Sequence, residues 1–147
     1  MAQIIFEKRE GKYDAMFVDR GGALEEVACP KQPPIPHDMF HYAVEHVLKL
    51  NGFIHRVAAG EAATFRMTEE AEGEAVERLV ETMQADSWSG RPPPAEVIDM
   101  FLTTCAARDT QPITVSEEAI VAIRAEIDRL AEAWNALPLR GRMTLEV

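Results

Sequence analysis

The sequence has no apolar run near the length of about 20 residues that a membrane-spanning helix needs, and it has only two cysteines, Cys29 and Cys105. The first absence predicts a protein that does not cross a membrane. The cysteines lie far apart and form no Cys-x-x-Cys pair, so we expect two free, buried thiols rather than a disulfide. The N-terminal segment lacks the basic and long apolar stretches of a secretory signal, which favours a cytoplasmic location.

Cationic residues are also scarce, because 15 Lys and Arg stand against 25 Asp and Glu, a formal net charge of −10. Residues 1–31 are nearly neutral, with five cationic and six acidic side chains, so the acidity lies in the later part of the chain. Such a surface repels phosphate backbones, so we expect neither nucleic acid nor an anionic membrane as a partner. The glycine-rich phosphate loops and the Gly-x-Ser-x-Gly nucleophile elbow are missing as well.

The length fits one domain over residues 1–147, and its first part predicts a small antiparallel sheet. The β-prone stretches, which are separated by glycine-containing turns, are residues 4–6, 13–18 and 24–28. Prolines over residues 30–34 then end the β pattern, because proline cannot donate to a β ladder. We therefore expect a β-meander over residues 1–30.

About four helices are expected over residues 36–137. Amphipathic patterns place them at about 36–50, from Thr68 onward, at about 94–107 and from Ser116 onward. Thr68 and Ser116 are each followed closely by two glutamates, which is typical of a helix N-terminus. The last helix has the cleanest apolar stripe, formed by Ile120, Ile123, Ile127, Leu130, Trp134 and Leu137.

The remaining patterns complete an α+β fold. In the second helix the expected core residues are Val76, Leu79, Val80 and Met83, and in the third they are Val97, Ile98, Phe101, Leu102 and Cys105. Pro138 ends the last helix, and residues 142–147 predict a short closing strand that joins the N-terminal sheet. We expect the helices to pack on one face of that sheet.

Three of the four histidines lie on the first expected helix. His37, His41 and Glu45 are spaced by four residues, which stacks them along one side of that helix. On a helical wheel this stripe borders the apolar side, whereas Asp38 and Tyr42 point away from the core. A stripe at such a border is where a cleft would be lined, so these residues are the first candidates for a functional site.

Imidazoles and carboxylates are common ligands of divalent transition metals such as zinc. At 1.5 Å rise per residue, His37 and Glu45 lie about 12 Å apart along the helix axis, too far for one ion to take all three side chains. An adjacent pair, either His37 with His41 or His41 with Glu45, could supply two of the ligands. The third ligand has to come from elsewhere, and His55 is the first candidate to test.

A metal-free site is equally consistent with the pattern. Glu45 or Asp38 could accept a hydrogen bond from one ring nitrogen of His41, fix its tautomer and make it a general base. His41 and Glu45 are therefore the candidate catalytic residues. His37, near the helix N-terminus, would stay neutral because the positive end of the helix dipole disfavours its protonated form.

The segment Pro36-His37-Asp38-x-x-His41-x-x-Val44-Glu45, followed by Gly52-Phe53 and Val57-Ala58-Ala59-Gly60, resembles a motif of a family of small uncharacterised bacterial proteins. Trp134-x-x-Leu137-Pro138 and the short final strand are similar too. About 25 residues resemble the family closely and the rest loosely. The family has no established activity, so the resemblance implies a bacterial, cytoplasmic origin and no catalytic residue.

Two classes of function follow from these patterns. The first is a protein that binds a metal ion or a small-molecule ligand through His37, His41 and Glu45, either as an enzyme or as a binding protein. The second is a non-catalytic interaction or structural protein whose histidines, with His46 and His55 among them, make polar surface contacts. A homodimer is compatible with both classes.

Overall fold

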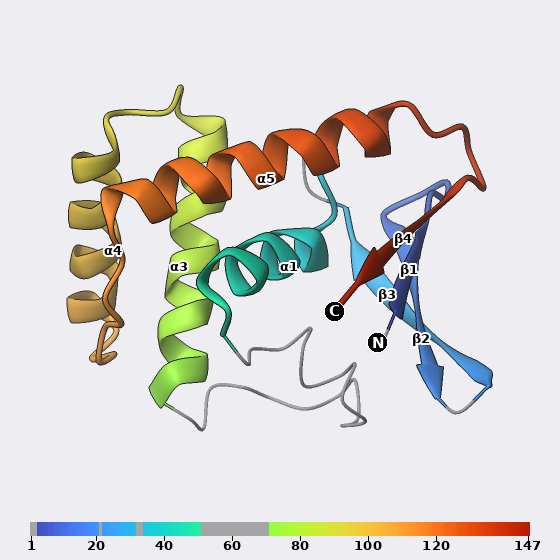
Figure 1. Ribbon diagram of the computed structural model, residues 1–147, viewed down its shortest axis with the longest axis horizontal. Coiled ribbons are helices and arrows are strands. Elements are labelled where there is room, and N and C mark those ends of the chain that lie inside the picture. The colour runs from blue at the N-terminus through green and yellow to red at the C-terminus, as the bar shows by residue number, and fades with distance from the viewer. Residues whose placement is uncertain (1–2, 21, 32–33, 51–70) are drawn as a thin grey trace.

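The computed structural model describes residues 3–20, 22–31, 34–50 and 71–147. Its elements, in chain order, are β1 (Gln3–Glu7), β2 (Tyr13–Arg20), β3 (Ala23–Pro30), α1 (His37–Leu48), α3 (Ala71–Trp88), α4 (Pro94–Ala107), α5 (Glu117–Asn135) and β4 (Arg142–Glu146). The strands form one antiparallel sheet in the order β3-β2-β1-β4, and the described helices gather on one side of it (Figure 1). The predicted α+β fold, with its N-terminal meander and closing strand, is confirmed.

One face of the sheet is buried against the helices. Ile4 of β1 lies opposite Val18 of β2 and Leu145 of β4, and Phe6 lies opposite Met16. All five side chains are almost inaccessible to solvent. Their positions follow the period of two that puts alternate strand residues on one face. Because β4 pairs with β1 along its full length, the two ends of the described chain meet in the same sheet.

α1 is the central helix, and it contacts α3, α5 and β3. Its eight residues from Asp38 to Glu45 are all buried. The prediction that Asp38 and Tyr42 point away from the core is wrong, because other elements cover that side of the helix. Cys29 of β3 interacts with Asp38, and the Tyr42 hydroxyl donates a hydrogen bond of 3.1 Å to the carbonyl oxygen of Glu146 in β4. α1 therefore has almost no solvent-facing side over its first two turns.

The other helices bury most of the expected stripes. The side chains that are fully or almost fully buried include Val76, Leu79, Val80 and Met83 on α3 and Ile120, Ile123, Ile127, Leu130 and Trp134 on α5. Ser116 caps α5 as predicted, because its hydroxyl accepts the Ala119 N–H at 3.1 Å. On α4 the inward position predicted for Leu102 is wrong. Leu102 is 43% exposed, since α4 packs mainly against α3 and α5 and buries a narrower stripe.

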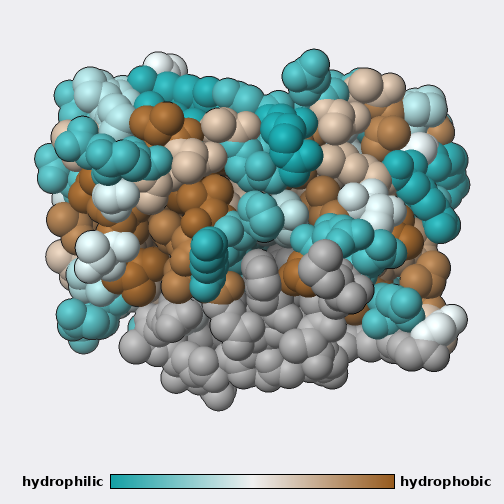
Figure 2. Space-filling model, viewed as in Figure 1, coloured by the Kyte–Doolittle hydropathy of each residue, from teal (hydrophilic) through white to brown (hydrophobic). Residues whose placement is uncertain are grey.

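Several smaller features complete the fold. α1 ends at Leu48, about two residues earlier than expected, because Lys49 adopts a left-handed conformation with φ 55°. The predicted helix start at Thr68 lies outside the described residues. Cys29 and Cys105 are free and buried, as expected. None of the described helices combines the length and apolar character needed to cross a bilayer. Apolar patches do reach the surface on the side of α3 and α4 (Figure 2).

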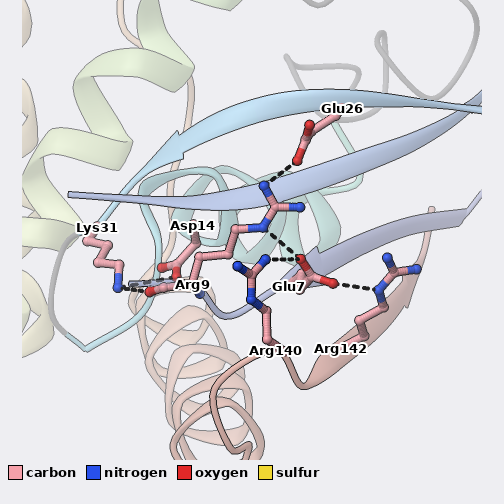
Figure 3. Close-up of polar contacts among 7 residues, drawn as sticks. All are labelled: Glu7, Arg9, Asp14, Glu26, Lys31, Arg140 and Arg142. Carbon is pink, nitrogen blue, oxygen red and sulfur yellow. Dashed lines mark hydrogen bonds and ion pairs between the residues drawn. The ribbon is translucent and has the colours of Figure 1, made fainter. Parts of the chain in front are cut away.

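The opposite face of the sheet carries a cluster of charged side chains around Glu7, here called the Glu7 network (Figure 3). The Glu7 carboxylate accepts hydrogen bonds from Nε of Arg9 at 2.6 Å and from Nε of Arg142 at 2.9 Å. The Arg140 guanidinium lies 3.8 Å away, and Glu26 pairs with Arg9. The hydrogen bonds from Arg9 and Arg142 lower the pKa of Glu7 from its ordinary value.

Candidate metal centre

α1 and α3 face each other along two polar stripes. α1 contributes His37, His41 and Glu45, and α3 contributes Glu77 and Gln84; this set is here called the α1–α3 seam. His37 contacts Gln84, whereas His41, one turn further along α1, contacts Glu77, which lies earlier on α3. The order of contacts is reversed between the two helices, because the earlier residue of α1 meets the later residue of α3. Residues that are far apart in the sequence thereby meet in one polar cluster.

His41 occupies the middle of the seam, with a carboxylate facing each ring nitrogen. Its Nδ1 lies 3.5 Å from Oε2 of Glu45, and its Nε2 lies 3.3 Å from Oε1 of Glu77. His41 is 2% exposed and Glu45 is completely buried, whereas the Glu77 side chain is 25% exposed. The imidazole is thus held between one interior carboxylate and one that reaches the surface.

His37 packs edge-on against His41, with ring centroids 5.0 Å apart and an interplanar angle of 76°. Its Nδ1 lies 2.7 Å from the side-chain amide of Gln84. A half-turn of that amide exchanges its NH₂ group and its oxygen, so the contact also suits an Nδ1–H that donates to the amide oxygen. In that arrangement His37 offers the Nε2 lone pair to a metal ion, and Gln84 fixes the orientation of the ring.

His37, His41 and Glu77 each place one potential ligand atom within 4.8 Å of the other two. Ligand atoms at about 2.1 Å from a tetrahedral zinc ion are separated by about 3.4 Å from one another. The 3.3 Å between Nε2 of His41 and Oε1 of Glu77 already has this value. The other distances between ligand atoms of the trio do not exceed 4.8 Å.

The two histidines titrate differently because their surroundings differ. Burial is the largest single influence on the pKa of His41 and lowers it, but Glu45, Glu77 and Asp38 together outweigh burial and raise that pKa above its ordinary 6.5. Burial also lowers the pKa of His37, and the neighbouring charge of His41 lowers it further. The carboxylates therefore favour the protonated form of His41, whereas burial and the neighbouring His41 favour the neutral form of His37.

The structure brings together two of the predicted site residues, His37 and His41, on one side of α1. Glu45 lies on the other side of the His41 ring, 3.5 Å from Nδ1, and stands apart from the three converging ligand atoms. His46 is exposed and stacks on Tyr42, with ring centroids 5.2 Å apart. His55, the predicted helper, lies outside the described residues.

Sequence reasoning missed Glu77 and Gln84. The sequence contains one relevant signal, because residues 77, 81 and 84 form a polar stripe at helical spacing beside the apolar stripe of α3. Nothing in that pattern says which helix the stripe faces. The partner of the histidine pair is therefore a property of the tertiary structure rather than of any local motif.

No protein-family model, no curated protein and no solved structure matches the chain. The resemblance of the Pro36-to-Glu45 segment to a bacterial family therefore stays an expectation. The chemistry open to the site has to be argued from the donor atoms, distances and charges of the seam itself.

Proposed function

We propose that this protein binds a divalent transition metal ion through His37, His41 and Glu77, and that zinc is the first ion to test. The observation that carries the proposal is the convergence of three ligand atoms from two helices within 4.8 Å. Two imidazoles and one carboxylate are the protein ligands of several catalytic zinc sites and of non-haem iron sites. Glu45 and Gln84, on the other ring nitrogens, act as the orienting partners that metal-bound histidines usually have.

The charge balance of the seam supports a cation. The carboxylates of Glu45, Glu77 and Asp38 all act on His41, and in the absence of metal a proton on the imidazole compensates part of that charge. A divalent ion brings two positive charges to the same place and displaces this proton. Among the described residues this buried cluster has more carboxylates than cations, which favours the binding of a metal ion.

A metal-free general base is the second candidate, because the Glu45–His41 contact of 3.5 Å resembles the carboxylate–imidazole pair of acid–base enzymes. Two observations weigh against it. The neighbouring carboxylates raise the pKa of His41, which disfavours the neutral imidazole that a general base needs. Its Nε2, the nitrogen that would act on a substrate, faces Glu77 at 3.3 Å.

The interaction or structural alternative assigned the histidines to surface contacts. His46 is exposed and fits that description, but His41 is buried. A purely structural role for the seam therefore leaves unexplained why a charged cluster lies in the interior. Such clusters are costly to bury unless their charges are compensated.

The decisive experiment measures zinc binding to the untagged, chelator-treated protein by isothermal titration calorimetry. We expect one zinc ion per chain. His41→Gln and Glu77→Gln should each weaken binding by at least about a hundredfold, since loss of even an orienting partner costs about 10–100-fold in metal affinity. The matched controls are His46→Gln on α1 and Glu74→Gln on α3, which change the same residue types on the same helices and should bind zinc like the wild type.

Thermal melts give an independent readout. Zinc at about 100 times its Kd should stabilise the protein by about 2.7 kcal/mol, and excess chelator should abolish the gain. The proposal fails if the wild type takes up no stoichiometric zinc, manganese or iron(II) and its melting temperature is unchanged by these ions. It also fails if all four variants bind the ion as tightly as the wild type.

A further inference from the structure

A pocket of about 450 Å³ lies where the sheet meets the helical layer. Its lining residues are Lys8, Asp14, Lys31, Pro34, Pro36, Trp134 and Asn135. They come from the ends of β1 and β3, the start of β2, the link to α1 and the last turn of α5. None of them belongs to the α1–α3 seam. The volume falls in the range of about 300–1,000 Å³ typical of small-molecule sites.

Lys8 is the most informative residue of this pocket. Its ammonium group donates hydrogen bonds to the carbonyl oxygens of Trp134 at 2.6 Å and Leu137 at 2.9 Å, and it lies 5.2 Å from the centroid of the Trp134 ring. These partners are neutral groups at the C-terminal end of α5. Among the described residues, no carboxylate lies within ion-pair distance of Lys8. The partial negative charge at this helix end compensates only part of the Lys8 charge, so the partly buried ammonium beside the cavity favours an anion there.

The other charged groups of the pocket nearly cancel each other. Asp14 is 4% exposed, its Oδ1 accepts the backbone N–H of Arg9 at 2.8 Å, and the same oxygen lies 3.5 Å from Nζ of Lys31 (Figure 3). The Asp14–Lys31 pair therefore contributes no net charge, and Lys8 leaves the described lining residues with one excess positive charge. Trp134, Pro34 and Pro36 provide an apolar wall, and the Asn135 amide adds a polar group to the lining.

We propose that this pocket binds a small organic carboxylate, with its anionic group near Lys8 and Lys31 and a compact apolar body against Trp134 and the prolines. One excess cation matches a monoanion. The whole chain carries a formal charge of −10, so its long-range field repels polyanions and favours a ligand of low charge. The proposal stands independently of the metal site, because the two share no residue.

The two tryptophans of the chain make a direct test possible. Trp134 lines the pocket, whereas Trp88 is 57% exposed at the end of α3 and serves as an internal reference. The indole N–H signals are followed by NMR during separate titrations with benzoate and with inorganic phosphate, and Trp88→Phe assigns them. We expect benzoate to shift the Trp134 signal in a saturable way and to leave Trp88 unmoved. Phosphate should bind more weakly by at least about tenfold, a difference that the two fitted Kd values report.

Lysine variants identify the cation. Lys8→Met should raise the Kd for benzoate by at least about tenfold and Lys31→Met by a smaller factor, whereas Lys12→Met, an exposed lysine outside the pocket, should leave it unchanged. Lys8 also anchors the end of α5, so if Lys8→Met does not fold, Lys31→Met and Asn135→Ala decide the question against the same control. Three results would overturn the proposal: no saturable shift of Trp134 in the wild type, equal affinities in the pocket variants and Lys12→Met, or phosphate binding as tight as that of benzoate.

Discussion

The α1–α3 seam and the Glu7 network are both built around carboxylates, but their charge balances are opposite. In the Glu7 network three guanidinium groups surround Glu7, and two of them donate hydrogen bonds of 2.6 and 2.9 Å (Figure 3). In the seam a single imidazole lies between two carboxylates, at 3.5 and 3.3 Å. Among the residues that the structure describes, cations outnumber carboxylates around Glu7, whereas carboxylates outnumber cations around His41.

The distances show the same difference. Charge-assisted hydrogen bonds are short, and those to Glu7 have the length expected of a satisfied ion pair. The contacts of His41 are longer and closer to the separation of ligand atoms around a metal ion. Both central carboxylates are buried, and the contrast lies in the cations, because His41 is 2% exposed whereas the Arg140 side chain is 70% exposed. The Glu7 carboxylate is thus matched by short ion pairs, whereas the described residues of the seam place more carboxylates than cations around His41.

The largest effect that tests this contrast is the removal of the imidazole from the metal-free protein. His41→Leu should lower the free energy of unfolding by about 3 kcal/mol, because breaking a buried ion pair on one side leaves the other charge poorly compensated. The loss is measured by urea denaturation in the presence of chelator. His46→Leu, on the same helix but exposed, should stay within about 0.5 kcal/mol of the wild type.

A double variant separates charge from packing. His41→Leu combined with Glu45→Gln removes the buried carboxylate together with its partner and should recover part of the lost stability. If His41→Leu lowers the free energy of unfolding by no more than His46→Leu does, the charges of the seam do not depend on His41 for compensation. The contrast between the seam and the Glu7 network would then be wrong.

The fold was predictable where the signals are local. Ser116 and the stripe of α5 identified that helix from neighbouring residues alone, and the turns around Gly11 and Gly22 separated the strands. The errors at Asp38 and Tyr42 have a different origin. A helical wheel assumes that one side of a helix faces water, but β3, β4 and α5 close around α1, and no feature of α1 itself announces those contacts.

The candidate site was predictable only in part for the same reason. The spacing of four residues correctly grouped His37 with His41, because that geometry belongs to a single helix. Helix rise also showed that one ion needs a further ligand from elsewhere in the chain. Glu77 lies on another helix, and its meeting with His41 depends on how α1 and α3 pack. Pair spacing within a helix can be derived from sequence, whereas the register between two helices requires the structure.

The next effect, intermediate in size, is the pH dependence of the seam in the metal-free protein. The pKa of His41 is raised in the folded state, so its protonation stabilises the fold, and this contribution is lost as the pH rises from 6.5 through the higher folded pKa. The pKa of His37 is lowered, so its protonation destabilises the fold, and stability is lost as the pH falls from 6.5 through the lower folded pKa. The contribution of the pair should therefore be largest near pH 6.5.

Urea denaturation between about pH 5 and pH 9 measures this profile. His41→Gln should remove the decline on the alkaline side, and His37→Gln should remove the decline on the acid side. Zinc affinity should follow the opposite trend above pH 6.5 and rise with pH, because the ion has to displace the proton of His41. A stability profile that is identical in the wild type and in both variants would contradict the electrostatic description of the seam.

The smallest effect is expected in the Glu7 network. Glu7→Gln preserves the shape of the side chain and removes its charge, and the guanidinium groups left behind can return to water because the side chains of Arg9, Arg142 and Arg140 are 30%, 49% and 70% exposed. The loss at neutral pH should be smaller than for His41→Leu, and smaller still in about 1 M salt, where the screening length is only about 3 Å.

The acid side of the profile tests Glu7 separately. Its pKa is lowered from 4.5, mainly by hydrogen bonds from Arg9 and Arg142, so its contribution is present above pH 4.5 and is lost as the pH falls through the lower folded pKa. The difference in urea midpoint between the wild type and Glu7→Gln should therefore shrink below pH 4.5. On the alkaline side, the difference in urea midpoint between the wild type and His41→Leu should be the same whether or not Glu7 is replaced. A loss of stability in Glu7→Gln that is as large as in His41→Leu and does not change with salt would contradict the contrast between the two clusters. The charges on the outer face of the sheet would then contribute as much to stability as those in the interior.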